Sequence, residues 1–175
     1  MNIRDFLDVR RLQELQDNFS EATGLAAVLL DNKGDRVTKE SNFTDFCMKY
    51  TQGSEEGLHR CIKCQSENSG VYYCHAGLMA FSIDIMLGSE KVGKVIGGQV
   101  LPRKADEEQF RRTASEIGVD QDSYINALKK VPISTEKNIR AAAELFGQMV
   151  NMFVNLEYSH NSNGGKLGQL QDEIN

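Results

Sequence analysis

The stretch at residues 79–87, MAFSIDIML, decides the fold because its odd positions are large and apolar throughout. Strict alternation over this length is typical of a β-strand with one face in the core. After the turn GSEK at 88–91, the stretch VGKVIGGQVL at 92–101 returns as a partner strand. The pair Gly97-Gly98 predicts a local weakening of this strand, at a bulge or a close backbone approach.

Upstream of this hairpin, the sequence predicts two helices and three more strands. Residues 9–19 have helical spacing, and LAAVLLD at 25–31 is a short apolar run. The turn DNKG at 31–34 and the stretch RVTKE at 36–40 would close a first hairpin. Residues 43–69 are predicted to be mostly helical, with Ser54 as an N-cap, and VYYCHAG at 71–77 follows as a strand.

Downstream of the hairpin, the sequence predicts helices only. Residues 105–118 and 121–130 form two of them, and a long helix starts near Ser134. Its apolar residues alternate steps of three and four, which favours packing along its whole length. They are Ile139, Ala142, Phe146, Met149, Phe153 and Leu156, followed in phase by Leu167, Leu170 and Ile174. Either the helix runs on through NSNGG at 161–165, or NSNGG ends the domain and a disordered tail follows.

This order of elements predicts an α+β fold with a central antiparallel sheet of about five strands, flanking helices and a long C-terminal helix. A chain of 175 residues suits one compact domain. We place that domain at residues 1–158. Residues 159–175 are predicted to be a linker and the start of a signalling coiled coil.

Composition excludes several classes of protein. The net charge is −5 and no basic stripe is present, so this domain is not expected to bind nucleic acid. No apolar run approaches the roughly 20 residues that span a bilayer. The N-terminal residues are charged where a signal peptide is apolar, so we expect no membrane association and a cytoplasmic location, where thiols stay reduced.

All four cysteines, Cys47, Cys61, Cys64 and Cys74, lie within residues 47–74. On a helix, Cys61 and Cys64 share a face, and Cys47 and Cys74 could fold back over it. A four-thiolate site of this kind suits zinc or an iron–sulfur cluster. Buried packing of the thiols and a redox switch are the alternatives. No catalytic motif is present, so we expect no enzyme activity and no catalytic residues.

Several motifs together resemble the PocR sensory domain: FTDFC at 43–47, the C-x-x-C pair, YYCHAGL at 72–78 and VGKVIGGQVL at 92–101. The similarity covers about residues 10–155. It implies a PAS-like input domain of a bacterial signalling protein that senses small hydrocarbon derivatives, such as short diols. Such domains precede DNA-binding, kinase, cyclase or chemotaxis-receptor modules. The family pattern D-x-x-x-P-I is replaced here by Ala80 and Asp84-Ile85.

A pocket for such a ligand needs aromatic walls and a few placed polar groups. The candidate ligand-binding residues are Phe43, Phe46, Tyr73, His75, Ser82, Asp84, Met86 and Gln99. Gln99 is favoured because the neighbouring glycines leave room beside it. Core packing is the alternative for Phe43 and Phe46, and only one of Tyr72 and Tyr73 can face the pocket.

The sequence thus favours a sensory domain, possibly of a soluble chemotaxis receptor, that relays ligand occupancy through its terminal helices. Its expected partners are a small-molecule ligand, a C-terminal output module and a second copy bound through the end helices. The alternative is a metal or iron–sulfur redox sensor built on the four cysteines.

Overall fold

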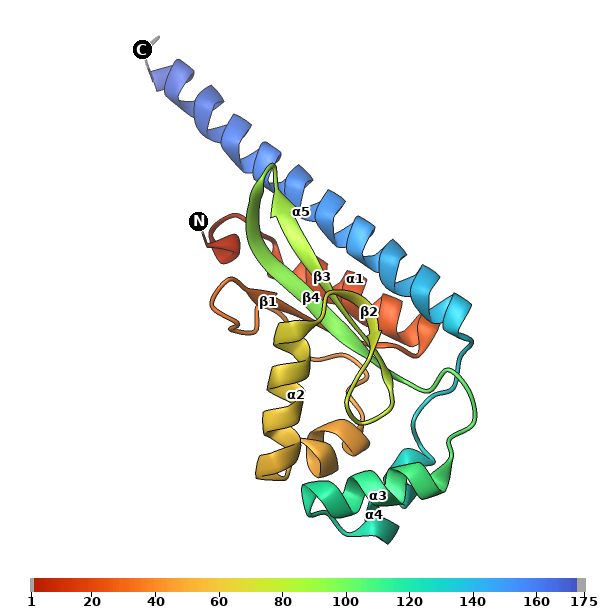
Figure 1. Cartoon of the computed structure of the whole chain (residues 1–175). Coiled ribbons are helices and arrows are strands. Elements are labelled where there is room, and N and C mark those ends of the chain that lie inside the picture. The colour runs from red at the N-terminus through yellow and green to blue at the C-terminus, as the bar shows by residue number, and fades with distance from the viewer. Residues whose placement is uncertain (1, 173–175) are drawn as a thin grey trace.

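The computed structural model describes residues 2–172, and the side chains of residues 2–162. Figure 1 shows the order of its elements along the chain. They are a 3-10 turn η1 (Ile3–Asp5), α1 (Val9–Thr23), β1 (Ala26–Asp31), a π-helical segment η2 (Phe46–Thr51), α2 (Glu55–Glu67), β2 (Gly70–Tyr73), β3 (Met79–Leu87), β4 (Glu90–Val100), α3 (Glu107–Ile117), α4 (Gln121–Leu128) and α5 (Glu136–Asp172).

The described strands form one antiparallel sheet in the order β1-β4-β3-β2. The predicted α+β class, the antiparallel sheet and the long C-terminal helix are therefore confirmed. The predicted number of about five strands is wrong, because the sheet has four. The stretch at 36–40 is not a strand and contributes only an isolated bridge between Leu30 and Arg36.

Side-chain hydrogen bonds, two of them from α1, explain why the stretch at 36–40 does not pair as a strand. Thr38 Oγ1 accepts a hydrogen bond from Leu29 N at 2.9 Å, in place of a backbone carbonyl. Gln16 Nε2 donates to Lys39 O at 2.7 Å, and Lys39 N donates to Gln13 Oε1 at 2.8 Å. Because the backbone of Lys39 is bonded to α1, this stretch contacts the backbone of β1 through the bridge at Arg36 and a hydrogen bond from Val37 N to Leu29 O. β1 forms its ladder with β4 along its other edge.

The predicted irregularity beside Gly97-Gly98 is confirmed as a β-bulge. Met79 pairs with Val100 and Ala80 pairs with Gly98, so Gln99 is the extra residue of β4. Gly98 has φ 103° and Gln99 has φ 55°, which places both in the left-handed region. A bulge re-aims the side chain of its extra residue, here Gln99.

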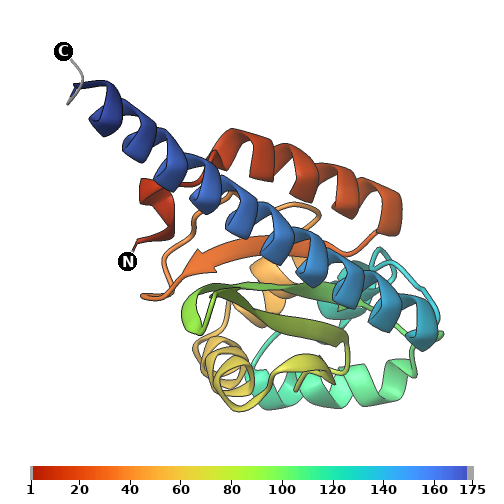
Figure 2. The ribbon, with the colours of Figure 1, turned by 90° about the horizontal axis from the view of Figure 1, so that it is seen from above.

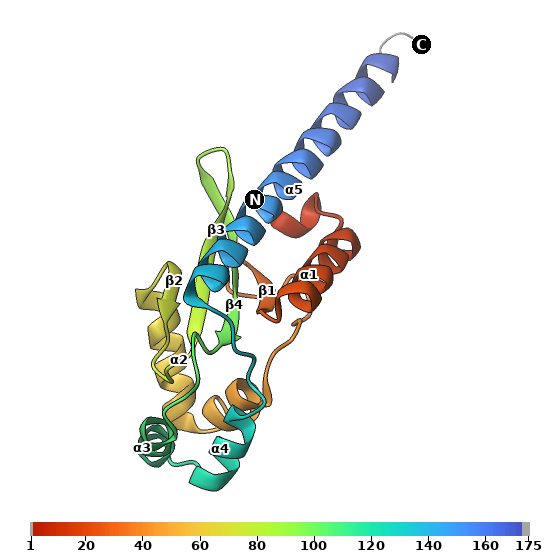
Figure 3. The ribbon, with the colours of Figure 1, turned by 90° about the vertical axis from the view of Figure 1, so that its right-hand side faces the viewer.

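The helices lie around the sheet in separate groups. Figure 3 shows α1 and α5 on one face and α2 on the other, with α3 and α4 beyond one end of the sheet. Figure 2 shows α5 lying across the sheet beside α1. One core cluster fills the space between the sheet, α1 and α5, and includes Phe81, Ile85 and Phe146. A second cluster joins η2, α3 and α4 and includes Phe46, Phe110 and Tyr124.

The predicted long helix passes without a break through NSNGG at 161–165 and ends at Asp172. Of its predicted seam, Ile139 and Phe146 are buried in the domain core, whereas Leu156 is 57% exposed. The side chains of Leu167 and Leu170 and all of Ile174 lie outside the described residues. The coiled coil predicted there stays a prediction, as does the domain boundary at 158.

Candidate functional site

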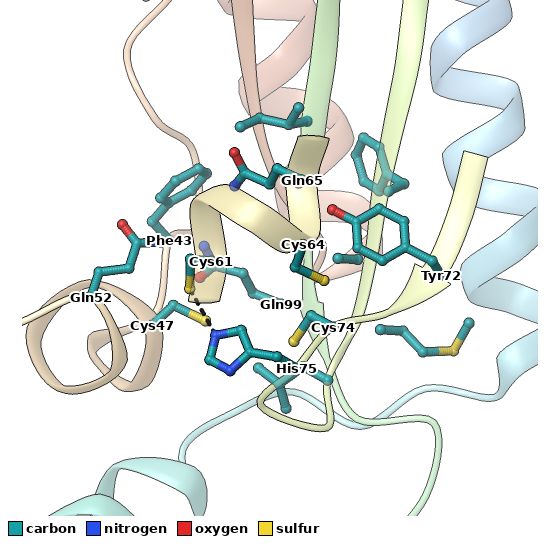
Figure 4. A pocket seen from close by; sticks show the side chains of 16 residues that line it. Phe43, Cys47, Gln52, Cys61, Cys64, Gln65, Tyr72, Cys74, His75 and Gln99 are labelled. Carbon is teal, nitrogen blue, oxygen red and sulfur yellow. Dashed lines mark hydrogen bonds between the residues drawn. The ribbon is translucent and has the colours of Figure 1, made fainter. Parts of the chain in front are cut away.

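A cavity of about 70 Å³ lies between α2, the sheet and the segment that precedes α2. Figure 4 shows its lining side chains, which come from distant parts of the chain. They are Phe43, Cys47, Gln52, Cys61, Cys64, Gln65, Tyr72, Cys74, His75, Leu78, Met79, Ala80, Phe81, Ile96, Gly97 and Gln99. A cavity of this size admits a molecule of only a few heavy atoms.

All four cysteines line this one cavity. The Ser54 hydroxyl caps α2 by accepting from Gly57 N at 3.0 Å, as predicted, and so fixes the start of the helix. Cys61 and Cys64 then share the helix face that looks into the cavity (Figure 4). Cys47 reaches the cavity from η2, and Cys74 from the turn that follows β2.

Burial keeps three thiols of this cavity, those of Cys47, Cys61 and Cys74, protonated. Desolvation, helped by the neighbouring thiols, raises the pKa of Cys61 to about 12. Desolvation also raises the pKa values of Cys47 and Cys74 well above the ordinary range of a thiol. At neutral pH these side chains are therefore uncharged.

His75 lies directly against one of these thiols. Its Nε2 atom is 3.1 Å from Cys61 Sγ. Burial, and next the positive charge of Arg60, lower the pKa of the imidazole, which favours its neutral form. The His75 Nδ1 atom is buried and has no hydrogen-bond partner among the described residues. A buried polar atom without a partner is unusual and favours a bound water, ion or ligand beside it.

Gln99 is the most tightly oriented polar group of the lining. Its Oε1 atom accepts from Thr44 N at 2.7 Å and from Thr44 Oγ1 at 2.9 Å. Its Nε2 group has no hydrogen-bond partner among the described residues, so its N–H groups are available to a ligand. No Asp, Glu, Lys or Arg is among the described lining residues. The cavity is thus uncharged and offers fixed hydrogen-bond donors.

The thiols are suitable metal ligands in kind, since zinc and iron–sulfur clusters both take cysteine sulfur. Their arrangement is a different matter. Within the part of the chain that the structure describes, no three His, Cys, Asp or Glu side chains are placed so that they could hold a metal ion. A metal would therefore require these side chains to move closer together.

The family model for the sensory domain found in PocR matches residues 5–158. The chain belongs to the PocR sensory domain family. It is also 28% identical over 153 residues to the regulatory protein PocR of Salmonella typhimurium. That match covers 82% of this chain and 50% of the relative, so the chain spans about half the length of this relative. No solved structure shows a significant match to the chain.

The structure brings three of the predicted ligand-binding residues of this PocR domain to the cavity: Phe43, His75 and Gln99. It places the other five elsewhere. Phe46 is buried in the second core cluster, and Ser82 is buried outside the lining. Tyr73 is half-exposed, and Asp84 forms a salt bridge with Lys91 at 2.5 Å on the surface. The Met86 backbone is bonded to Asn151 and Asn155 of α5.

Two lining residues of the PocR domain were missed although the sequence held a signal for each. Tyr72 and Tyr73 alternate along β2, so only one of them can face the cavity. Tyr72 does so, because α2 covers its side of the strand. Gln65 follows Cys61 by four residues and therefore lies on the same face of α2. Gln52, Leu78 and Ile96 carried no comparable signal.

Proposed function

We propose that this PocR domain binds a small uncharged molecule in the thiol-lined cavity and passes the occupancy signal to α5. The observation that carries the proposal is a cavity lining without Asp, Glu, Lys or Arg that holds the side-chain amide of Gln99 in a fixed orientation. An ion in such a site would lose its hydration without gaining a partner of opposite charge, which is costly. A neutral hydroxyl or carbonyl oxygen would instead accept from Gln99 Nε2.

The ligand class that fits best is a short hydrocarbon derivative, such as a diol of two to four carbons. Aromatic and aliphatic groups line much of the cavity, among them Phe43, Tyr72 and Ile96. Carbon atoms of a short diol would contact these walls, and its hydroxyl groups would bond Gln99 and the Tyr72 hydroxyl. Its small volume agrees with the size of the cavity.

Strand β2 connects the cavity to the beginning of α5. Tyr72 faces the cavity, and the next residue, Tyr73, donates from its hydroxyl to Glu136 Oε2 at 2.8 Å. Glu136 is the first residue of α5. One turn later, Arg140 Nη1 donates to Val71 O at 3.4 Å. A ligand that displaces β2 would thereby change the contacts of α5, which is how we propose that binding reaches an output module.

One relative that resembles this chain is a regulatory protein, PocR. We propose a comparable input role here, joined through α5 to an output module, of which a chemotaxis receptor is one form. Recognition without catalysis and a cytoplasmic location are part of this proposal. None of the described helices has the length and apolar character needed to cross a membrane.

We expect propane-1,2-diol to bind the metal-free chain and propionate, with the same number of carbons, to show no binding. The Gln99→Gly variant should bind the diol about tenfold more weakly, because it loses the anchored donor. Isothermal titration calorimetry measures both. The substitution relieves a positive φ, so we expect the variant to fold.

Asn42→Gly is the matched control for this titration. Asn42 also has a positive φ, 54°, and is not among the residues that line the cavity. Its variant should bind the diol as the parent does. Equal binding of diol and propionate, or unchanged binding by Gln99→Gly, would contradict the proposed site.

The second candidate function is a metal or iron–sulfur redox sensor, and the observation that favours it is the convergence of four thiols on one cavity. For this function we expect anaerobically purified protein to carry about one zinc or one cluster per chain, the latter with visible absorbance. Metal analysis and an absorption spectrum measure this.

For the same function, Cys61→Ala and Cys64→Ala should each lower the melting temperature more than the loss of a buried thiol does. A chelator should lower the melting temperature of the parent as well. If the purified protein contains no metal and its melting temperature is the same with and without chelator, the metal-sensor function is wrong.

A further inference from the structure

Helix α5 carries an apolar stripe that the domain body does not cover. Leu145, Met152 and Leu156 are 56%, 61% and 57% exposed, and Met149 between them is half-buried. Their spacing along the helix is four, three and four residues. Large apolar side chains that are exposed in a continuous row mark a surface for association.

This stripe faces away from the domain body. Gly147 marks the opposite side of the helix, where α5 comes so close to β3 that a Cβ atom at Gly147 would lie 2.7 Å from Ile83 Cγ2. Val150 and Val154, on the same side as Gly147, are fully buried. At about 100° of rotation per residue, the four stripe residues lie within roughly 40° of the direction opposite to Gly147. A partner could therefore approach the stripe without meeting the sheet.

The surface around the stripe carries little charge, with the guanidinium of Arg11 from α1 lying 5.7 Å from the centre of the Phe153 ring at one flank. Within about 70° of its centre, at 100° per residue, the described residues of α5 include no Asp, Glu, Lys or Arg. They are Asn138, Ala141, Ala142, Gln148, Phe153, Ser159 and His160 besides the stripe itself. Depletion of charge together with enrichment in methionine is typical of the centre of a protein–protein interface.

We propose that a second copy of this chain binds along the stripe, with the two α5 helices parallel and related by a two-fold axis. Alternating steps of three and four residues are the repeat that packs one helix against another in a left-handed coiled coil. A two-fold axis makes the same surface serve both partners, so the surface must not repel itself. The flanks on α5, which carry no Asp, Glu, Lys or Arg among the described residues, meet this requirement in a chain whose net charge is −5.

The parallel orientation is part of the proposal, and the position of the body on α5 leaves room for it. Because the sheet lies on the side of the helix opposite to the stripe, the two bodies would occupy the outer sides of the helix pair. In the parallel orientation both helices run in the same direction to Asp172. The interface does not involve the thiol-lined cavity, so it stands or fails independently of ligand binding.

We expect sedimentation equilibrium of the 175-residue chain to show a reversible dimer. Met152→Glu should raise its dissociation constant at least about thirtyfold, because a carboxylate would be buried against its own symmetry mate. The matched control is Ile62→Glu, which changes a side chain on α2 that is also 61% exposed. This control should dimerise like the parent.

A second variant tests the orientation. In a parallel two-fold pair, Leu145→Cys would lie next to its own copy and form an intermolecular disulfide under mild oxidation, whereas Ile62→Cys would not. Circular dichroism melts establish that each variant is folded. A chain that stays monomeric up to its solubility limit, or a dimer that Met152→Glu leaves intact, would overturn the proposal. Cross-linking by Ile62→Cys as efficient as by Leu145→Cys would overturn it as well.

Discussion

Replacement of Gly97 by alanine is expected to lower the free energy of unfolding by at least about 3 kcal/mol. A Cβ atom at Gly97 would lie 1.9 Å from Ala26 O on β1 and 2.8 Å from Phe81 Cζ on β3. The first of these neighbours is backbone, held in the ladder between β1 and β4, so it has little freedom to move away. Relief would require separating the two strands. Urea denaturation of parent and variant measures the loss.

Gly34→Ala is the control for this substitution. Gly34 has φ +87° but no atom within 4 Å of a built Cβ atom, so only the cost of a strained backbone applies. We expect a loss of about 1 kcal/mol there. If Gly97→Ala lost no more stability than Gly34→Ala, the close approach of β1 to β4 would be wrong. The wall of the cavity formed by Gly97 and Gln99 would then need a different description.

Local pattern was enough to predict the elements whose reasons are local. The alternation at 79–87 is found as β3, and Ser54 caps α2 because its side chain needs only the backbone three residues later. The bulge beside Gly97-Gly98 was predicted because two successive glycines weaken a strand wherever the strand lies. The pairing of Cys61 with Cys64 on one helix face likewise follows from helix geometry alone.

The wrong or missing predictions share a different cause. The pattern of RVTKE at 36–40 predicts a strand, yet Gln13 and Gln16 of α1 bond the backbone of Lys39 within it. No local pattern shows that α1 lies there. Tyr73 was chosen as the candidate for the pocket, whereas Tyr72 lines the cavity, because the choice depends on which face of β2 the helix α2 covers. Such choices are made by packing between segments that are distant in the sequence.

Phe46 is the clearest example of this limit, since the sequence does not tell whether it or Phe43 faces the cavity. The structure places Phe43 in the cavity wall and Phe46 in the second core cluster. The Phe46 ring is 4.3 Å from the ring of Tyr124 and 5.9 Å from that of Phe110, between centroids. Edge and tilted contacts of this kind join η2 to α3 and α4.

Phe46→Ala is therefore expected to lower the free energy of unfolding by about 3–5 kcal/mol, the usual cost of removing a fully buried aromatic ring. The Phe46 side chain is fully buried, and the atoms around it belong to three different elements that cannot all close the gap. Phe43→Ala should cost about 1 kcal/mol, because the space it opens joins an existing cavity and its ring is only half-buried. Urea denaturation of the two variants makes the comparison.

Calorimetric titration with propane-1,2-diol adds a second, independent comparison between the same variants. Phe43→Ala removes a wall and should weaken binding, whereas Phe46→Ala, measured well below its melting temperature, should leave the affinity near that of the parent. Phe46 would then contribute mainly to stability and Phe43 mainly to ligand binding, although they are only three residues apart. Equal stability losses for both variants, or loss of diol binding in Phe46→Ala alone, would reverse their assignment and move the cavity toward α3 and α4.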